Sequence, residues 1–481
     1  MKFSFVFPSQ APGDVDMCSR AWPPLGILYI AGVLMKEGIE VSLLDQTVKG
    51  FSNRQVLAWV KKENPDILGF SVLQSAAEEA PKIAELAKAW NPNITMVMGN
   101  YHATFNDVRI LKKYPFVDVI VRGEGEYTSF DLAECLGKGQ DLRRVSGITF
   151  RAKNGNIIST PDRPLIKNVD RLPFPNRDLL NAQYTSTIFG VKVATKKFTT
   201  VLSSRGCSFQ CSFCGCRRFA RGVWRPRSVE NVMEELEMLR GEGYEEILFV
   251  DDNFTLNSKR VKKLCKRIRK EKLGIQWFCD SRVDNCEYDM FREMVRAGCN
   301  SLYFGMESAN QRILDYYRKG ITPDQSVNAA RKARKAGVDV IVGSFIVGAP
   351  YETRREVENT LDFVQKLDID MPSFSILSAI SGTEIWKDLT TRGLINEEEC
   401  WEKCVYVPKV SPGTVPFEEI RSMIYDHFRE FYLRPKQLLK EIFRTLTSSY
   451  RIGVFLANVP RIKTIINEVR QGVSYGQALA K

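Results

Sequence analysis

Short apolar runs alternate with amphipathic stretches through the first quarter of the chain. This alternation of strands and helices predicts a parallel, doubly wound sheet. Ligands of such sheets bind outside the carboxyl ends of the strands, so the turns Gly99–Thr104 (GNYHAT) and Arg122–Glu126 (RGEGE) are candidate binding segments. The expected strands are SFVFP, EVSLLD, DILGFSV, TMVMG and VDVIV, with helices in PPLGILYIAGVLMKEG, around Val56–Trp59 and from about Ala76 to Ala89.

The alternation starts again at Thr199 and predicts a second, separate sheet. It contains six strand–helix units in about 190 residues, whereas a full eight-unit barrel usually needs about 250. We therefore expect a partial (β/α)6 barrel that is open on one side. Its expected strands are TTVLSS, EEILFVDD, IQWFCDSR, SLYFGMES, DVIVGSFIVG and PSFSILSA.

These patterns divide the α/β chain into four parts: residues 1–145, 146–195, 196–400 and 401–481. The second is a connector with a hairpin predicted to turn at Asn154-Gly155. The fourth is a helical extension that mixes aromatic residues with 11 Lys/Arg and 6 Asp/Glu from Phe417 onward.

Composition places the chain among globular proteins of a reducing compartment. Its 481 residues are 44% hydrophobic and 26% charged, without a signal peptide or an apolar run of 18 residues. Twelve cysteines without a secretory signal indicate free thiols, so we expect a cytosolic protein. The net charge of +12 is spread along the chain. Because no recognition motif accompanies it, we expect a solvated basic surface and no nucleic-acid partner.

Three cysteines, Cys207, Cys211 and Cys214, lie within SSRGCSFQCSFCGC, directly after the first predicted barrel strand. That position is the mouth of the barrel, where active sites lie. Structural zinc needs four ligands and iron–sulfur clusters normally use four cysteines. Three closely spaced thiols therefore indicate a cluster with one iron left open for a ligand outside the protein. Cys216 is an alternative fourth ligand, although its place next to Cys214 in CGC is cramped.

The CxxxCxxC spacing, with Phe213 before the third cysteine, resembles the radical S-adenosylmethionine (SAM) superfamily. Further segments resemble its branch with an N-terminal cobalamin-binding domain, and the similarity covers roughly residues 1–390. That branch includes methyltransferases that act on unactivated carbon and the anaerobic cyclase of magnesium-porphyrin monomethyl ester. The segments are PRSVENVMEELEML, EILFVDDNFTLNSKRVKKLC, WFCDSRVD, AGCNSLYFGMESANQRIL, KGIT, GSFIVGAPYET, PPLGILYIAGVL, GNYHAT and RGEGE.

The resemblance implies a [4Fe–4S] cluster on Cys207, Cys211 and Cys214, with SAM chelated by the open iron. One electron from the cluster would cleave SAM to methionine and a 5′-deoxyadenosyl radical that abstracts hydrogen from substrate. Matching positions imply SAM contacts from the ends of successive strands. Those positions are Phe213, Asp251, Asp252, Ser281, Arg282, Glu307, Gly343, Ile346 and Gly348.

The same resemblance implies cobalamin at the N-terminal domain, with contacts from Gly99, Tyr101, His102, Thr104, Gly123 and Glu124. The loop after the first strand, Pro8–Arg20, lacks the histidine that ligates cobalt in cobalamin-dependent mutases, so the cofactor would lack that lower ligand. Family members usually carry two glycines where this chain has Gly99-Asn100. A nicotinamide cofactor is disfavoured, because no G-x-G-x-x-G follows the first strand.

Several positions depart from the family pattern on the substrate side. Pro350-Tyr351-Glu352 replaces proline-glycine-glutamate, and Ser381-Gly382-Thr383 replaces proline-glycine-threonine. Substrate identity therefore cannot be inherited from the family. Cys400 and Cys404 have the spacing of a further metal site, but with no third partner nearby we expect them to pack as apolar residues.

We expect a radical enzyme that methylates an unreactive carbon of a small molecule, with cobalamin as methyl carrier. A cyclase or carbon–carbon bond-forming enzyme is the alternative within the fold, and an electron-transfer or metal-sensing protein is the alternative outside it. A ferredoxin or flavodoxin would supply electrons. The helical extension is expected to cap the open barrel, and its basic, aromatic stretches also suit an inner membrane surface and an apolar lipid or tetrapyrrole substrate.

Overall fold

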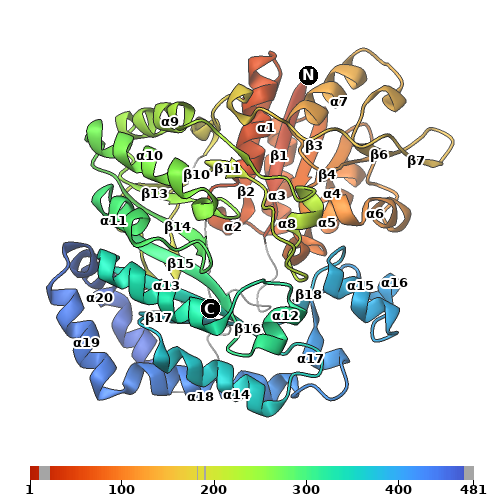
Figure 1. Ribbon diagram of the computed structural model, residues 1–481. Coiled ribbons are helices and arrows are strands. Elements are labelled where there is room, and N and C mark those ends of the chain that lie inside the picture. The colour runs from red at the N-terminus through yellow and green to blue at the C-terminus, as the bar shows by residue number, and fades with distance from the viewer. Residues whose placement is uncertain (10–21, 181, 189–190, 471–481) are drawn as a thin grey trace.

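The N-terminal sheet of the computed structural model is doubly wound, as predicted (Figure 1). The structure describes residues 1–9, 22–180, 182–188 and 191–470, so most of the loop Pro8–Arg20 and the last residues of the tail lie outside it. The strand order is β2-β1-β3-β4-β5-β6-β7. The first five strands are parallel: β1 (Lys2–Phe7), β2 (Glu40–Asp45), β3 (Ile67–Ser71), β4 (Thr95–Gly99) and β5 (Val119–Val121).

The predicted hairpin belongs to this same sheet. Strands β6 (Ile148–Arg151) and β7 (Ile157–Ser159) pair with each other, and β6 pairs antiparallel with β5. Apolar side chains of helices cover both faces of the sheet, which buries them in two layers. One face carries α1 (Leu25–Lys36) and α7 (Glu126–Gly137), and the other carries α3 (Asn53–Glu63) and α4 (Glu79–Trp90).

The second sheet is the expected six-stranded, all-parallel partial barrel. Its end strands β10 and β17 do not pair, so it is open on one side. The strands are β10 (Phe198–Val201), β13 (Glu246–Phe249), β14 (Gln276–Arg282), β15 (Cys299–Glu307), β16 (Val340–Val347) and β17 (Met371–Ile376). The outer helices include α9 (Val229–Gly241), α10 (Ser258–Lys270), α11 (Tyr288–Arg296), α13 (Pro323–Ala336) and α14 (Arg354–Phe363).

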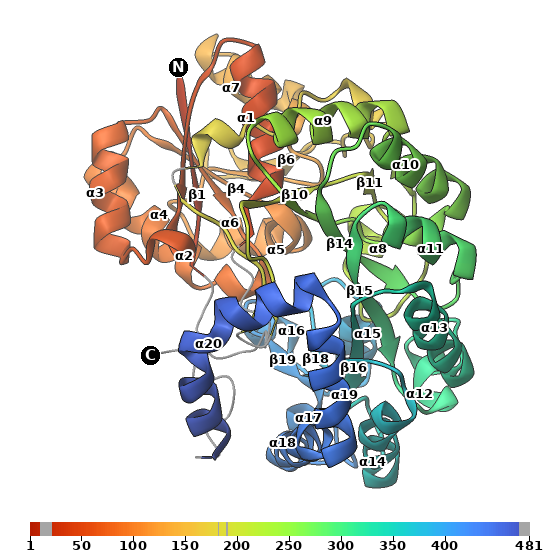
Figure 2. The same cartoon turned by 90° about the vertical axis from the view of Figure 1, so that its left-hand side faces the viewer.

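Three helices of the C-terminal extension, α18 (Phe417–Leu433), α19 (Pro435–Leu446) and α20 (Ser449–Arg470), pack against the barrel (Figure 2). Arg444 and Arg451 form ion pairs with the buried Asp370, which directly precedes β17. Helices α19 and α20 therefore cover the end of the barrel where strands begin, opposite the mouth, whereas Ile420 of α18 packs against Gly348 just after β16. Within the described residues, no helix is long and apolar enough to cross a membrane.

A buried charge cluster ties the segment before the barrel to its first helix. Glu235 of α9 is fully buried and accepts hydrogen bonds from Arg177, at 2.7 Å, and from Arg227. Arg177 also donates to the carbonyl of Thr200 in β10, at 2.7 Å. One carboxylate thus neutralises two guanidiniums that lie out of water.

We expect Glu235→Ala to lower the free energy of unfolding by about 3–5 kcal/mol, because it leaves two buried cations unpaired. Urea denaturation followed by circular dichroism measures the change. Glu234→Ala, at an exposed position of the same helix, is the control and is expected to change stability by about 0.5 kcal/mol or less. Equal losses in the two variants would contradict a role for the cluster.

Candidate functional site

The cysteine loop begins directly after β10, at the mouth of the barrel, as predicted. Two aspartates after β13 fix its start. Asp251 is buried and accepts hydrogen bonds from the backbone and hydroxyl of Ser203, both at 2.7 Å, and from Ser204. Asp252 accepts one from the backbone of Gly206, at 3.0 Å. Both carboxylate oxygens of Asp251 therefore accept hydrogen bonds from the loop. Asp252, by contrast, is exposed.

Gly206, directly before the first cysteine, is required by the backbone of the loop. Its φ is +82°, and a Cβ there would lie 2.3 Å from the carbonyl oxygen of Val223. Only glycine adopts this conformation with such close backbone contact. The loop therefore closes tightly on the segment that follows it.

The three cysteines fit the donor set of an iron–sulfur cluster better than a single ion. All three are partly exposed, and Cys211 and Cys214 line a cavity of about 540 Å³. Burial and the neighbouring thiols raise the pKa of Cys214 to about 11, so a bound metal would have to hold the thiolate form. In the part of the chain that the structure describes, no three His, Cys, Asp or Glu side chains converge on one ion. A cluster, with a separate iron for each thiolate, does not need that convergence.

Cys216 does not line the cavity with Cys211 and Cys214. Its thiol is buried and interacts with the carboxylate of Asp252. Burial and this carboxylate raise the pKa of Cys216, which disfavours the thiolate that a metal would require. The structure thus offers three thiols to a cluster and directs the fourth elsewhere.

Arg282, at the end of β14, lies beside the cysteine loop. Its guanidinium is 3.6 Å from the ring centroid of Phe209, and its Nη1 is 3.6 Å from Sγ of Cys211. Arg282 thus directs a hydrogen-bond donor at the sulfur of Cys211. Asp284 accepts a hydrogen bond from Arg282 at 2.7 Å and holds it in place. Ser281 is buried and hydrogen-bonds Thr255, at 2.8 Å, instead of opening into the mouth.

Glu307 ends β15 with a backbone conformation that is rare for its residue type. Its φ is +63°, and its buried carboxylate pairs with Lys319 at 2.6 Å. Such strain persists where the surrounding structure enforces it, often at binding sites. Lys319 lies 5.9 Å from the ring of Phe213, which packs edge-on against Tyr317. Glu307, Lys319 and Phe213 therefore form one connected group beside the loop.

The three predicted SAM contacts in and just after β16 do not share one environment. A Cβ at Gly343 would contact Met306 and Ile369, at 3.1 and 3.2 Å, so this glycine faces the helix-packed core and not the barrel interior. Ile346 is partly buried on the opposite face. Gly348 has a φ of +86° and packs under Pro408 of the C-terminal part. Only Ile346 of these three is placed to face a molecule inside the barrel.

The turn after β4 meets the cysteine loop directly. The ring of Tyr101 stacks on Phe219 with centroids 4.3 Å apart, and a Cβ at Gly215 would lie 3.2 Å from it. Asn100 has a φ of +81° and donates to Ser71 at 2.9 Å. Asparagine tolerates this left-handed conformation, which explains how the chain manages without a second glycine after Gly99.

His102 is buried and points away from the mouth. Its Nδ1 lies 3.0 Å from Oε1 of Gln74, and its ring stacks on Trp401 with centroids 5.5 Å apart. Burial lowers the pKa of His102 to about 4, so it is neutral at physiological pH. The ring of His102 is therefore held by Gln74 and Trp401 and is not directed toward a cobalt ion at the carboxyl edge of the sheet.

The turn after β5 is held close to the turn after β4. The hydroxyl of Thr104 accepts a hydrogen bond from the backbone of Gly123, at 3.1 Å. Both turns lie at the carboxyl edge of the N-terminal sheet, and the strand order reverses at the same edge, between β1 and β3. Such a switch point is where doubly wound sheets bind ligands, so the edge fits a large planar cofactor such as cobalamin.

Glu124 joins the turn after β5 to the segments that flank the cysteine loop, a role that sequence reasoning missed. Its buried carboxylate accepts hydrogen bonds from Arg205 at 3.0 Å and from Arg225 at 2.9 Å. Although burial opposes the charge, the two guanidiniums hold the pKa of Glu124 below its usual value. Arg205 also pairs with Glu126 at 2.5 Å. Acidic residues in RGEGE and arginines flanking the cysteines were the available signal for this pairing.

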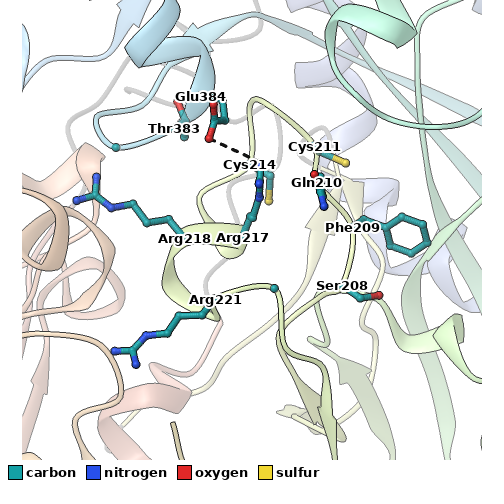
Figure 3. Close-up of a pocket in the computed structure, with 12 residues that line it drawn as sticks. Ser208, Phe209, Gln210, Cys211, Cys214, Arg217, Arg218, Arg221, Thr383 and Glu384 are labelled. Atoms are coloured by element: carbon teal, nitrogen blue, oxygen red, sulfur yellow. Dashed lines mark ion pairs between the residues drawn. The ribbon is translucent and has the colours of Figure 1, made fainter. Parts of the chain in front are cut away.

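The cavity beside Cys211 and Cys214 has a cationic wall that the sequence did not single out (Figure 3). Arg217, Arg218 and Arg221 contribute guanidiniums from the segment after the loop, and Glu384 of α15 (Glu384–Thr391) lies across from Arg217 at 3.7 Å. The cavity thus combines thiols, cations and the divergent stretch at Gly382 in one place.

Comparisons with known proteins agree with both halves of this site. Residues 201–364 match the Radical SAM superfamily, and residues 19–133 match the B12 binding domain. The chain is 38% identical to a protein of Pyrococcus horikoshii named uncharacterized methyltransferase PH0819, over 92% of this chain and 95% of that one. It is 28% identical to the anaerobic magnesium-protoporphyrin IX monomethyl ester cyclase of Rubrivivax gelatinosus, over 90% and 78%.

A solved structure shares the fold along nearly the whole chain. It is the cobalamin-dependent SAM radical enzyme OxsB with aqua-cobalamin and SAM bound, which aligns with a TM-score of 0.71 at 19% identity. The alignment covers 98% of this chain and 75% of that one. The doubly wound sheet, the partial barrel and their order are therefore a shared arrangement.

The structure predicts an unusual pH dependence at Glu352, after β16. Its Oε2 accepts hydrogen bonds from the backbones of Gly348 and Ala349, whereas its Oε1 is buried without a partner. Burial raises the pKa of Glu352 to about 7. The folded state therefore binds a proton that the unfolded state has lost, and stability falls as pH rises from about 4.5 to 7.

We expect Glu352→Gln to remove this loss, which amounts to about 3 kcal/mol at most. Urea denaturation at pH 5 and pH 8 measures it: the wild type should lose more stability between the two than the variant does. Glu237→Gln, at an exposed position of α9, should behave like the wild type. An identical pH dependence in wild type and Glu352→Gln would refute the assignment.

Proposed function

Because the chain belongs to the cobalamin-binding branch of the radical SAM superfamily, we propose that it transfers a methyl group to an unreactive carbon of a small molecule. The observation that carries the proposal is the direct contact between the cysteine loop and the cobalamin-binding sheet, through Tyr101 on Phe219 and Glu124 on Arg205. Methyl transfer needs the radical site and the methyl carrier next to each other. The name of the relative in Pyrococcus horikoshii supports the same reaction.

When bound, the [4Fe–4S] cluster supplies the electron that cleaves SAM, and cobalamin supplies the methyl carrier. Cys207, Cys211 and Cys214 would hold the cluster, and Arg282 would donate a hydrogen bond to the sulfur of Cys211. Asp252 borders the open space beside the loop, where a carboxylate suits an ammonium group of SAM. Phe213 lies where an aromatic ring can pack on adenine.

The N-terminal sheet would hold cobalamin at its carboxyl edge. Tyr101 closes that edge against the loop, and Thr104 fixes the backbone of Gly123. Neither His102 nor a residue of the described part of the first loop offers a cobalt ligand there, so we propose binding without a histidine from the protein. An external one-electron donor such as ferredoxin or flavodoxin would reduce the cluster.

Isotopically labelled SAM tests the reaction itself. In the anaerobically reconstituted enzyme, visible absorption should show both iron–sulfur and cobalamin bands, and label from the SAM methyl group should appear in product. Formation of 5′-deoxyadenosine without any methylated product would favour cyclisation or carbon–carbon bond formation, the reaction class of the cyclase relative. Iron–sulfur bands without any SAM cleavage would favour an electron-transfer or metal-sensing protein.

Alanine at any of Cys207, Cys211 or Cys214 should lower the rate of 5′-deoxyadenosine formation at least ~100-fold, because each removes one of only three cluster ligands. Iron content and product chromatography measure the effect. Cys216→Ala is the matched control for iron content, since its thiol interacts with Asp252 and does not line the cavity. Full activity in Cys211→Ala, or loss of iron from Cys216→Ala, would overturn this ligand set.

We also propose that the C-terminal helices rest on an anionic membrane surface. Of the 16 large hydrophobic residues that are exposed in the described chain, 10 lie within residues 433–459. Leu439, Ile442, Phe443 and Leu446 share one face of α19, and three of them are at least two-thirds exposed. Residues 433–470 carry 8 Lys/Arg and 2 Asp/Glu, which favours anionic lipid.

The double variant Leu439→Glu/Phe443→Glu should bind vesicles of phosphatidylglycerol and phosphatidylcholine at least ~10-fold more weakly than the wild type, because it places charges on the apolar face. Cosedimentation measures the binding. Leu86→Glu alters an exposed leucine on α4 and serves as control. Wild-type protein that does not bind the vesicles would contradict the membrane contact.

A further inference from the structure

The cavity next to the cysteine loop carries more positive charge than the protein neutralises. Arg217, Arg218 and Arg221 all line it, and among the described residues of its lining Glu384 is the one carboxylate. Arg217 lies 3.7 Å from Glu384, yet its Nη1 is buried without a hydrogen-bond partner. Arg221 donates a hydrogen bond to the carbonyl of Arg163, at 3.2 Å, and lies 3.5 Å from Asp162. The wall therefore keeps unused guanidinium donors.

Arg218 is the most strongly positioned of the three arginines. Its guanidinium lies 4.6 Å from the ring centroid of Phe105. On its other side is Gly382, where a Cβ would come within 2.4 Å of Nη1 of Arg218. Gly382 also has a φ of +89°, so glycine is required there for two reasons. The guanidinium is thus clamped between an aromatic face and a bare backbone.

This clamped cation has no ion-pair partner within 4 Å in the described chain. Burial lowers the pKa of Arg218, and the carboxylates of Asp107 and Glu397 oppose that effect only from a distance. Arg218 is nevertheless an exposed residue, so its guanidinium, held in one orientation, is accessible to an anion from solution. Arginine also binds phosphates and carboxylates through two parallel hydrogen bonds, which requires the fixed plane seen here.

We propose that Arg218, with Arg217 and Arg221, binds the phosphate, phosphonate or carboxylate group of the substrate. This inference rests on the proposed function and deepens it, because it defines the chemical class of the molecule to be methylated. The wall shares its cavity with Cys211 and Cys214 and with Thr383 and Glu384 from the divergent substrate side. An anionic group bound there anchors the substrate next to the radical site.

Binding of methylphosphonate to the reconstituted enzyme, loaded with cluster and cobalamin, tests this site. The dithionite-reduced cluster is paramagnetic and accelerates ³¹P relaxation of a phosphonate bound beside it. We expect accelerated ³¹P relaxation with wild type and about ten-fold weaker methylphosphonate binding with Arg218→Gln. Binding should recover in part in Arg218→Lys, because lysine keeps the charge but lacks the planar guanidinium. Arg54→Gln, at an exposed position of α3, is the matched control and should match the wild type.

Two other anions compete for the same wall, and separate measurements distinguish them. If Arg218 binds the phosphodiester of cobalamin, Arg218→Gln weakens cobalamin but not cobinamide, which lacks that group. If it binds the carboxylate of SAM, the variant raises the SAM concentration needed for 5′-deoxyadenosine formation. Either result, or wild-type relaxation equal to that of Arg218→Gln, overturns a substrate site. Absence of 5′-deoxyadenosine from the wild type would instead refute the proposed function while leaving methylphosphonate binding measurable.

Discussion

One buried carboxylate, Glu124, fixes the cysteine loop to the N-terminal sheet. It is shared by Arg205, two residues before the first cysteine, and by Arg225, which pairs with it from the far side of the loop. A charge group of this kind is expensive to bury, and removing one partner typically costs about 3–5 kcal/mol. The charge group of Glu124, Arg205 and Arg225 fixes the position of the loop relative to the N-terminal sheet. The loop would carry the cluster, and the edge of the sheet would carry cobalamin. The two cannot separate without breaking these ion pairs.

The other contacts of the mouth are arranged around this fixed point. The hydrogen bonds of Asp251 and the left-handed backbone of Gly206 set the path of the loop. Tyr101, from the N-terminal edge, stacks on Phe219 just after the loop. Arg218 lies against the same N-terminal edge, between Phe105 and Gly382. The exposed apolar helices α19 and α20 cover the other end of the barrel, where strands begin. A membrane contact there leaves the cationic mouth open to water, which suits a substrate with an anionic group better than a wholly apolar one.

The sequence was sufficient for the two sheets, their order and the cysteine loop, because periodicity and local spacing determine all of these. It was insufficient for pairings between distant residues. Glu124 and Arg205 are 81 positions apart, and no local pattern indicates that a turn carboxylate faces an arginine of another sheet instead of a cofactor. Asp251 and Gly343 have the expected positions along the chain but face the protein interior, because successive residues of an extended strand point to opposite sides. Asn100 replaces a glycine without loss, because its left-handed φ is one that asparagine also adopts.

Hydrogen–deuterium exchange of residues 203–216 in a Glu124→Gln variant tests the central claim most directly. Glu134→Gln, at an exposed position of α7 in the same domain, is the control. If Glu124 holds the loop, amides of 203–216 should exchange about ten-fold faster in Glu124→Gln than in wild type or control, although the substitution lies in the turn after β5 of the N-terminal domain. Unchanged protection of the loop in Glu124→Gln would contradict the account, because the two halves of the site would then be joined by something other than this carboxylate.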